Sequence, residues 1–192
     1  MPPVRRPPLP PEPFPRALRP VDPVRPVEPV AVTELFTEAM AQLAAGVAVV
    51  TAREGRDDIG TTVSTLMSVS LEPPLVLVSL AGTGYLNEVL LRQDRWAASL
   101  LSSDQTAVAS RFAAAGRPSA RLLVAGTPHH RGPHTEALVI EGGVAAIEAE
   151  TTKVVVAGDH TIFIAAVLAV DYVDASRQPL VRLRSRYRTI AT

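Results

Sequence analysis

Apolar and polar residues are distributed along this chain in two different patterns. Between Thr33 and Gly46, apolar residues recur at the spacing of one helical face, and these two residues have the chemistry of a helix start and stop. Beyond Gly46, most apolar runs are short and rich in β-branched residues, which predicts strands. The expected strands cover residues 46–52, 59–66, 75–80, 96–101, 137–141, 144–150, 154–156, 161–172 and 180–190.

Strands outnumber helices in this prediction, and short turns join most of them. Two more helices are expected at 85–92 and 104–115, the second capped by Asp104. Short turns suit antiparallel strands, because parallel strands need long crossover connections. The chain is therefore predicted to be mainly β with flanking helices, arranged as an antiparallel barrel.

The first part of the chain has a different composition from the rest. Twelve of the 18 prolines fall within the first 30 residues. Proline fixes φ and removes an amide donor, so residues 1–32 are expected to form an extended arm. This arm is either a disordered or surface-draped tail, or a segment that docks on a partner or a sister subunit. Residues 33–192 are expected to form the folded domain.

Composition excludes several kinds of chemistry. The 19 basic and 19 acidic residues balance, so bulk attraction to nucleic acid or to an anionic membrane is not expected. Cysteine is absent, which excludes disulfides, thiolate nucleophiles and cysteine-bound metal clusters. No apolar run is long enough for a secretory signal or a membrane span, so the cytoplasm is the expected location. Because the chain has no cysteine to act as a redox group, redox chemistry would require a bound cofactor.

Short hydroxyl side chains are concentrated between Gly60 and Pro74, in the sequence GTTVSTLMSVSLEPP. Small hydroxyls allow a flat ligand to approach the backbone, while amides and hydroxyls bind its oxygen atoms. The same composition also suits an ordinary edge strand. Composition alone leaves both interpretations open.

This segment, followed by LVLVSL, resembles the signature of the flavin reductase-like proteins, which have the FMN-binding split-barrel fold. Further points of resemblance are Arg111-Phe112-Ala113, Gly158-Asp159-His160 ahead of TIFIAAV, and Ser185-Arg186-Tyr187-Arg188. The likeness extends over roughly residues 34–190. It implies a Greek-key split β-barrel that forms a homodimer.

The resemblance also implies a function and a set of site residues. Such proteins reduce FMN or FAD with NADH or NADPH as co-substrate, and often supply a flavin-dependent monooxygenase. His160 would be the catalytic residue, facing the nicotinamide. The residues implied in cofactor binding are Thr61, Thr62, Val63, Ser64, Thr65, Ser68, Val69, Ser70, Ala81, Gly82, Thr83, Gly84, Phe112 and Tyr187. Two alternatives remain: an oxidase or oxygenase with tightly bound flavin, and a non-catalytic flavin-binding or interaction module.

Three other features have both a structural and a functional interpretation. Gly82 and Gly84 could present backbone amides to a phosphate, or simply form a strand-to-helix turn. Strand periodicity places the arginines of 180–190 on one face, where Arg182 and Arg186 could bind a phosphate unless the face is merely solvated. Residues 116–136 are expected to form an irregular polar loop, whose histidines lack the spacing of metal ligands, so no metal site is expected. They are His129, His130 and His134.

Overall fold

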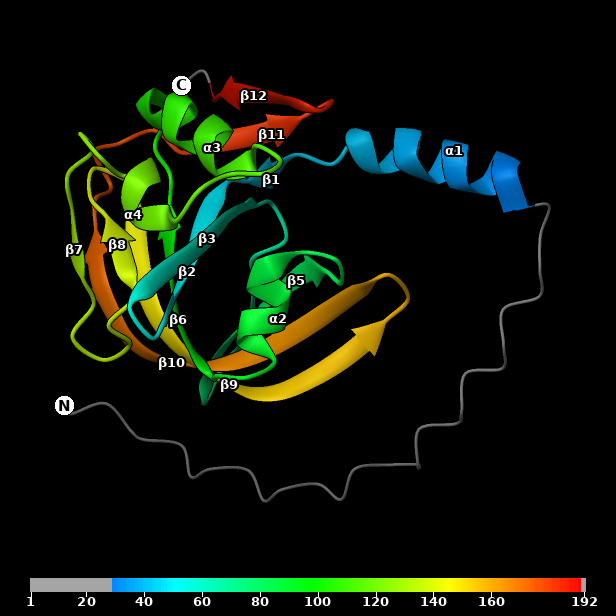
Figure 1. The fold of residues 1–192 in the computed structure, drawn as a ribbon. Coiled ribbons are helices and arrows are strands. Elements are labelled where there is room, and N and C mark those ends of the chain that lie inside the picture. Colours follow the sequence, from blue (N-terminus) through cyan, green and yellow to red (C-terminus); the bar gives the residue numbers. More distant parts are fainter. Residues whose placement is uncertain (1–28, 191–192) are drawn as a thin grey trace, which may run out of the picture. The chain divides into compact units, whose positions relative to one another are not determined.

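The computed structural model describes residues 29–190 (Figure 1). The chain divides into two compact units, Met1–Thr37 and Glu38–Thr192. Helix α1 (Pro29–Ala41) crosses this boundary and begins four residues before the expected Thr33. Proline is well suited to the first helical turn, because its missing amide would be unpaired there in any case. The rest of the expected arm, residues 1–28, lies outside the described residues.

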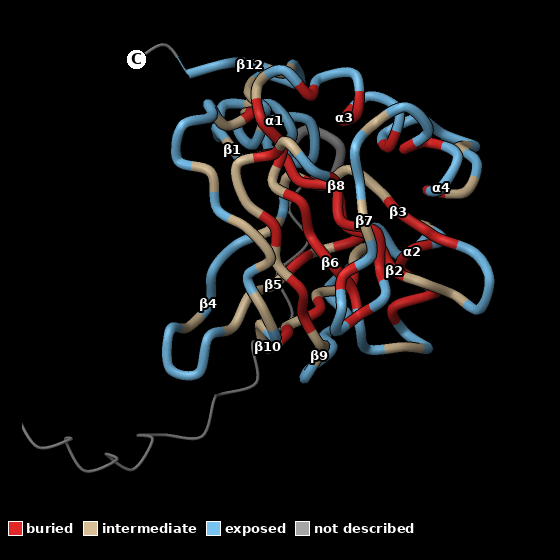
Figure 2. The backbone as a smooth tube through the Cα atoms, turned by 90° about the vertical axis from the view of Figure 1, so that its left-hand side faces the viewer, coloured by how far each residue is buried: buried red, intermediate tan, exposed pale blue. Residues whose placement is uncertain are grey.

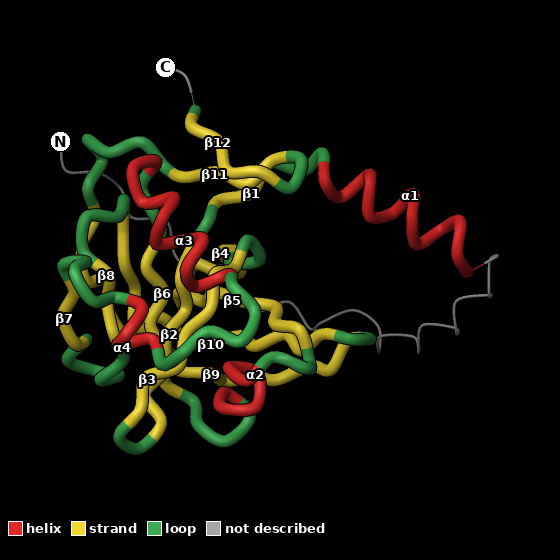
Figure 3. Tube along the Cα trace, turned by 45° about the horizontal axis from the view of Figure 1, so that its top comes forward, coloured by secondary structure: helices red, strands yellow, loops and turns green. Residues whose placement is uncertain are grey.

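The second unit consists mainly of antiparallel strands, as the sequence predicts (Figures 1 and 3). Seven strands form one sheet in the order β3-β2-β6-β9-β10-β5-β4, and smaller sheets join β1-β11-β12 and β7-β8. The strands are β1 (Ala45–Gly46), β2 (Ala48–Glu54), β3 (Asp57–Val63), β4 (Met67–Leu71), β5 (Pro74–Ala81), β6 (Arg95–Leu100), β7 (His129–Arg131), β8 (Leu138–Ile140), β9 (Ala145–Ala157), β10 (His160–Val173), β11 (Leu180–Leu183) and β12 (Arg186–Thr189). The helices after α1 are α2 (Tyr85–Leu90), the short 3₁₀ helix η1 (Ser103–Gln105), α3 (Thr106–Ala113) and α4 (Ala120–Leu123).

Two expectations about strand boundaries were wrong. The expected strands 144–150 and 154–156 are one continuous strand, β9, which forms a long hairpin with β10. The expected strand 180–190 is a hairpin of two strands, because Arg184 and Ser185 form its turn with φ values of 51° and 57°. Asparagine or glycine usually occupies such left-handed turn positions, so this sequence carried no recognisable turn signal.

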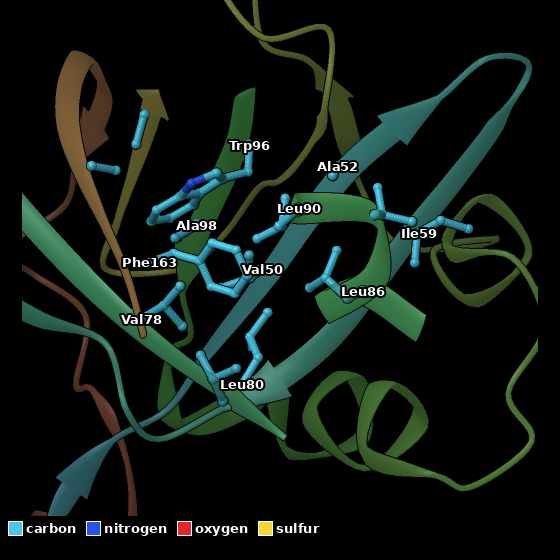
Figure 4. Packing of buried hydrophobic residues seen from close by; sticks show 14 of the residues in the cluster. Val50, Ala52, Ile59, Val78, Leu80, Leu86, Leu90, Trp96, Ala98 and Phe163 are labelled. Carbon is cyan, nitrogen blue, oxygen red and sulfur yellow. The ribbon is translucent and has the colours of Figure 1, made fainter. Parts of the chain in front are cut away.

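Two buried clusters account for most of the hydrophobic core. In the first, Trp96 and Phe163 lie between the sheet and α2 (Figure 4), and the Trp96 indole donates a hydrogen bond to the Thr151 hydroxyl at 3.1 Å. In the second, Phe112 of α3 packs beneath the edge of the sheet with Val49 and Ile140. Figure 2 shows that buried residues are concentrated in the central strands, whereas β4 is largely exposed.

The two edge strands of the large sheet, β3 and β4, are consecutive in the chain. The link between them passes close to β5, where the Thr65 hydroxyl donates to the Ser79 carbonyl at 2.7 Å and accepts from the Ser79 amide at 3.4 Å. This side chain binds β5 beyond the point where β4 stops pairing with it. The Thr65 hydroxyl therefore helps to close the sheet on itself.

We expect Gly60→Ala to destabilise the fold. A Cβ at this position would lie 2.8 Å from the Phe112 ring, which is fully buried within the core. Overpacking of this kind costs about 1–3 kcal/mol. Urea unfolding should show the loss, while Gly46→Ala, whose Cβ would meet nothing within 4 Å, serves as the matched control. Equal stabilities for the two variants would contradict the close contact.

Candidate functional site

A pocket of about 320 Å³ lies against strand β3 and gathers part of the hydroxyl-rich segment. We call it the β3 pocket. Five of the residues implied by the resemblance line it together with three others. The lining residues are Val47, Thr61, Thr62, Val63, Ser64, Ala113, Arg182 and Tyr187. Residues separated by more than 120 positions in the sequence thus meet at one site.

The edge position of β3 explains why its backbone is available to a ligand. The carbonyls of Asp58 and Gly60 accept hydrogen bonds from Ser119 Oγ at 3.2 Å and Arg117 Nε at 2.8 Å, so they point away from β2. Backbone direction alternates along a strand, so the peptide groups of Thr62 point to the same free edge. The Thr62 hydroxyl donates to the Ala109 carbonyl at 2.7 Å and thereby fastens β3 to α3.

A second pocket, of about 410 Å³, adjoins the other half of β3. We call it the α2 pocket. Its lining residues are Asp57, Ile59, Gly60, Thr83, Gly84, Tyr85, Gly116, Arg117, Pro118 and Ser119. Arg117 is fixed by bonds to the Gly60 and Ala114 carbonyls, and burial lowers its pKa. A hydrogen bond from Ser119 lowers the pKa of Asp57, so the pocket contains one cation and one anion.

The loop between β5 and α2 does not present its glycine amides as expected. The Gly82 amide donates to the Asp159 carbonyl at 2.8 Å, and the Gly84 amide donates to the Ala81 carbonyl at 2.9 Å. Both donors are therefore already bound within the fold. In this arrangement neither amide is free to hold a phosphate, although Thr83 and Gly84 do line the α2 pocket, and a role for this loop in cofactor binding stays a prediction.

His160 is the first residue of β10 and pairs with Ala81 across the β5–β10 ladder. This pairing places the histidine beside the loop that leads to the α2 pocket. Its Nδ1 lies 2.8 Å from Asp159 Oδ1, and the bond lowers the pKa of Asp159. The imidazole is 43% exposed and could therefore meet a ligand from solvent.

The remaining residues implied by the resemblance lie apart from the β3 pocket. Ser68, Val69 and Ser70 are on β4, where Ser68 and Val69 are exposed and Ser70 is half-buried. The Thr65 hydroxyl is bound to β5, as described above. Phe112 is fully buried, so its ring is a packing residue and cannot touch a ligand in this arrangement. A role for the β4 residues in cofactor binding stays a prediction.

The sequence analysis gave no binding role to several pocket residues. Val47 and Ala113 are ordinary apolar residues, and Arg117 and Ser119 lie in a segment expected to be an irregular loop. Arg182 carried a signal, as a member of the expected arginine row. The hairpin breaks that row: Arg182 pairs with Tyr187, whereas Arg186 pairs with Leu183 and therefore lies on the opposite face.

One of the three histidines of the expected loop, His130, belongs to a cluster of ion pairs. His130 lies on β7, with Nδ1 3.0 Å from Glu141 and Nε2 3.1 Å from Asp171. Burial lowers the pKa of His130, but the bonds to the two carboxylates outweigh this effect and raise it overall. Within residues 29–190, no group of histidine and acidic residues could hold a metal ion.

In the described part of the chain, no helix combines the length and apolar character that a bilayer span requires. The described fold is an antiparallel sheet with a hydroxyl-lined pocket at its edge. A model of the flavin reductase-like domain matches residues 40–191. The chain therefore belongs to the flavin reductase-like domain family.

Proteins of known name show the same similarity. An NADH-dependent FMN reductase from Streptomyces nodosus subsp. asukaensis is 35% identical over 161 residues, covering 81% of this chain and 83% of the relative. The reductase component of 4-hydroxyphenylacetate 3-monooxygenase from Thermus thermophilus is 34% identical, covering 82% and 96%. An actinorhodin polyketide dimerase from Streptomyces coelicolor is 37% identical, covering 82% and 86%.

A solved structure shares the fold. The NADH:FAD oxidoreductase of Streptomyces globisporus, in complex with NAD and FAD fragments, superposes with a TM-score of 0.77 at 27% identity. The superposition covers 88% of this chain and 98% of that one. The expected fold class is thereby confirmed.

We expect the stability contributed by His130 to depend on pH. The folded-state pKa of His130 is raised, so its contribution is fully present below the unfolded pKa of about 6.5 and disappears as pH rises through the folded value. His130→Gln should therefore lose more stability at pH 6 than at pH 8.5. Because the side chain is 38% exposed, the difference should stay below about 1 kcal/mol. Unfolding curves at the two pH values provide the test, and an equal loss at both would contradict it.

Proposed function

We propose that this protein is an NAD(P)H:flavin oxidoreductase that reduces FMN or FAD and supplies the reduced flavin to a partner monooxygenase. The observation that carries the proposal is the β3 pocket, in which residues of the family signature meet Tyr187 and a free strand edge. The bound flavin and nicotinamide would supply the hydride-transfer chemistry. The polypeptide has no cysteine and so no thiol redox group of its own.

The donor set of the β3 pocket fits a flavin. Four hydroxyl groups and one guanidinium suit a ligand that carries ribityl oxygens and a phosphate. Val47, Val63 and Ala113 offer apolar surface for a flat ring. Among the described residues no carboxylate lines this pocket, so a bound phosphate would not be repelled by a negative charge there.

His160 would bind and orient the nicotinamide rather than act as an obligatory acid. Its position beside Ala81 links it to the loop that borders the α2 pocket. Hydride transfer depends chiefly on how closely the two rings are held and how they are oriented. The protein would therefore accelerate the reaction by positioning the rings.

Assembly and location form part of the proposal. Three strands of the large sheet, β4, β9 and β10, expose large apolar side chains on described residues, and a second copy of the chain is the occupant expected from the family. These side chains are Met67, Val69 and Leu71 on β4, Val154, Val155 and Val156 on β9, and Leu168, Val170 and Val173 on β10. A homodimer would cover such a surface. Analytical ultracentrifugation tests the dimer, and the cytoplasm remains the proposed location.

The similarity to a polyketide dimerase favours a second candidate function. Under this alternative, the protein would keep its flavin tightly bound and act on an organic substrate. Gel filtration distinguishes the two, because a prosthetic flavin should co-elute with the protein and a diffusible flavin should separate from it. A third possibility, an adaptor that works through its arm, predicts that removal of residues 1–32 abolishes its activity, whereas a reductase should keep turnover.

The direct test is to mix the purified protein with FMN or FAD and with NADH or NADPH. Loss of the reduced-nicotinamide absorbance, in proportion to protein, would support the reductase. Absence of both flavin binding and nicotinamide oxidation would exclude it. The four combinations also establish which flavin and which nicotinamide are preferred.

We expect His160→Ala to weaken the use of NADH more than the binding of flavin. Loss of a single neutral hydrogen bond should raise the KM for NADH by roughly 3- to 10-fold. Flavin affinity, followed by fluorescence quenching, should change much less. His129→Ala removes another exposed histidine, which lies on β7 in a different sheet from Ala81, and serves as control. A larger effect on flavin than on NADH would refute this assignment.

A further inference from the structure

The C-terminal hairpin contributes one arginine to the β3 pocket. Arg182 on β11 lies opposite Tyr187 on β12, and residues paired across a ladder share a face of the sheet. Both residues line the pocket. The hairpin thus turns a cation and a phenol toward the strand that carries the hydroxyl-rich segment.

Arg182 is not used by the fold in the way that several other arginines are. Arg131 binds both carboxylate oxygens of Asp58, Arg117 binds two backbone carbonyls, and the Arg184 guanidinium binds the Gln42 side-chain oxygen. Among the described residues, the Arg182 guanidinium has no hydrogen bond and no ion pair. An exposed cation with no structural partner is available to a ligand.

The groups around Arg182 complete an oxyanion site. The Thr61, Ser64 and Tyr187 side chains line the same pocket, and within the described part of the chain none of their hydroxyls has a hydrogen-bond partner. Hydroxyls and a guanidinium all donate to phosphate oxygens. Within residues 29–190, no acidic residue lines the β3 pocket, in contrast to the α2 pocket, where Asp57 is present.

The other candidate phosphate site, the loop of residues 81–84 that leads into α2, has few groups that could bind an anion. Residues 81–84 include no basic side chain, and the amides of Gly82 and Gly84 are bound within the fold. Helix α2, which follows, has only six residues. An anion would therefore find little to hold it at the start of α2.

We propose that Arg182, with the hydroxyls of Thr61, Ser64 and Tyr187, binds the 5′-phosphate of the flavin. This inference rests on the proposed reductase function and adds a means of discrimination, because riboflavin lacks the phosphate. The protein then binds FMN more tightly than riboflavin. Arg186 plays no part, since it lies on the other face of the hairpin.

The test measures binding of FMN and riboflavin by fluorescence quenching, with the full chain and with Arg182→Gln. One charge-assisted bond at an exposed site should weaken FMN binding about 10-fold, and riboflavin binding should be unchanged. Raising the salt concentration should weaken FMN binding to the native protein more than to Arg182→Gln. Arg186→Gln is the matched control and should bind both flavins as the native protein does.

Each other result has a distinct meaning. Equal affinity of the native protein for FMN and riboflavin, or an equal loss for both in Arg182→Gln, would overturn the phosphate site and leave the reductase proposal standing. A rise in the KM for NADPH but not NADH in Arg182→Gln, with FMN affinity unchanged, would assign the site to the nicotinamide nucleotide and overturn our proposal. Failure of the native protein to bind any flavin would overturn the reductase function together with this site.

Discussion

The free edge of strand β3 is the constraint on which the site depends. An edge strand leaves a row of backbone donors and acceptors unpaired, and a soluble protein must cover them. Here, side chains rather than another strand cover part of the row: Ser119 and Arg117 bind the carbonyls at its beginning, and the Thr62 hydroxyl fastens it to α3. The two pockets lie along the same edge, where no strand covers it.

The packing behind β3 supports this edge. Gly60 allows the Phe112 ring to lie directly against the strand, so α3 and the second core cluster back the wall of both pockets. Thr65, two residues after the end of β3, then binds the Ser79 carbonyl on β5. This bond holds the hydroxyl-rich segment against β5. The hydroxyl-rich segment therefore serves in part to fasten the fold, while two of its hydroxyls that line the pocket, those of Thr61 and Ser64, have no partner among the described residues.

Much of the fold, and the core of the site, could be predicted from the sequence because short apolar runs and the signature are local patterns. The expected strands 75–80 and 96–101 correspond to β5 and β6, and Thr61, Thr62, Val63, Ser64 and Tyr187 meet in one pocket. Features that depend on backbone geometry were not predictable. The turn at Arg184 and Ser185 contains no glycine, and nothing local indicates that Phe112 is buried or that Gly82 donates to Asp159.

The turn of the C-terminal hairpin has a consequence for how the chain tolerates shortening. The Arg184 amide donates to the Ala41 carbonyl at 2.7 Å, and its Nε donates to Gln42 Oε1 at 2.9 Å. The two residues of β1 pair with β11, and the adjacent Val47 amide donates to the Leu180 carbonyl at 3.0 Å. Residues 41–46 therefore support the hairpin that bears Arg182 and Tyr187. Shortening the chain into these residues would loosen the wall of the β3 pocket that this hairpin forms, whereas the wall formed by β3 would stay in place.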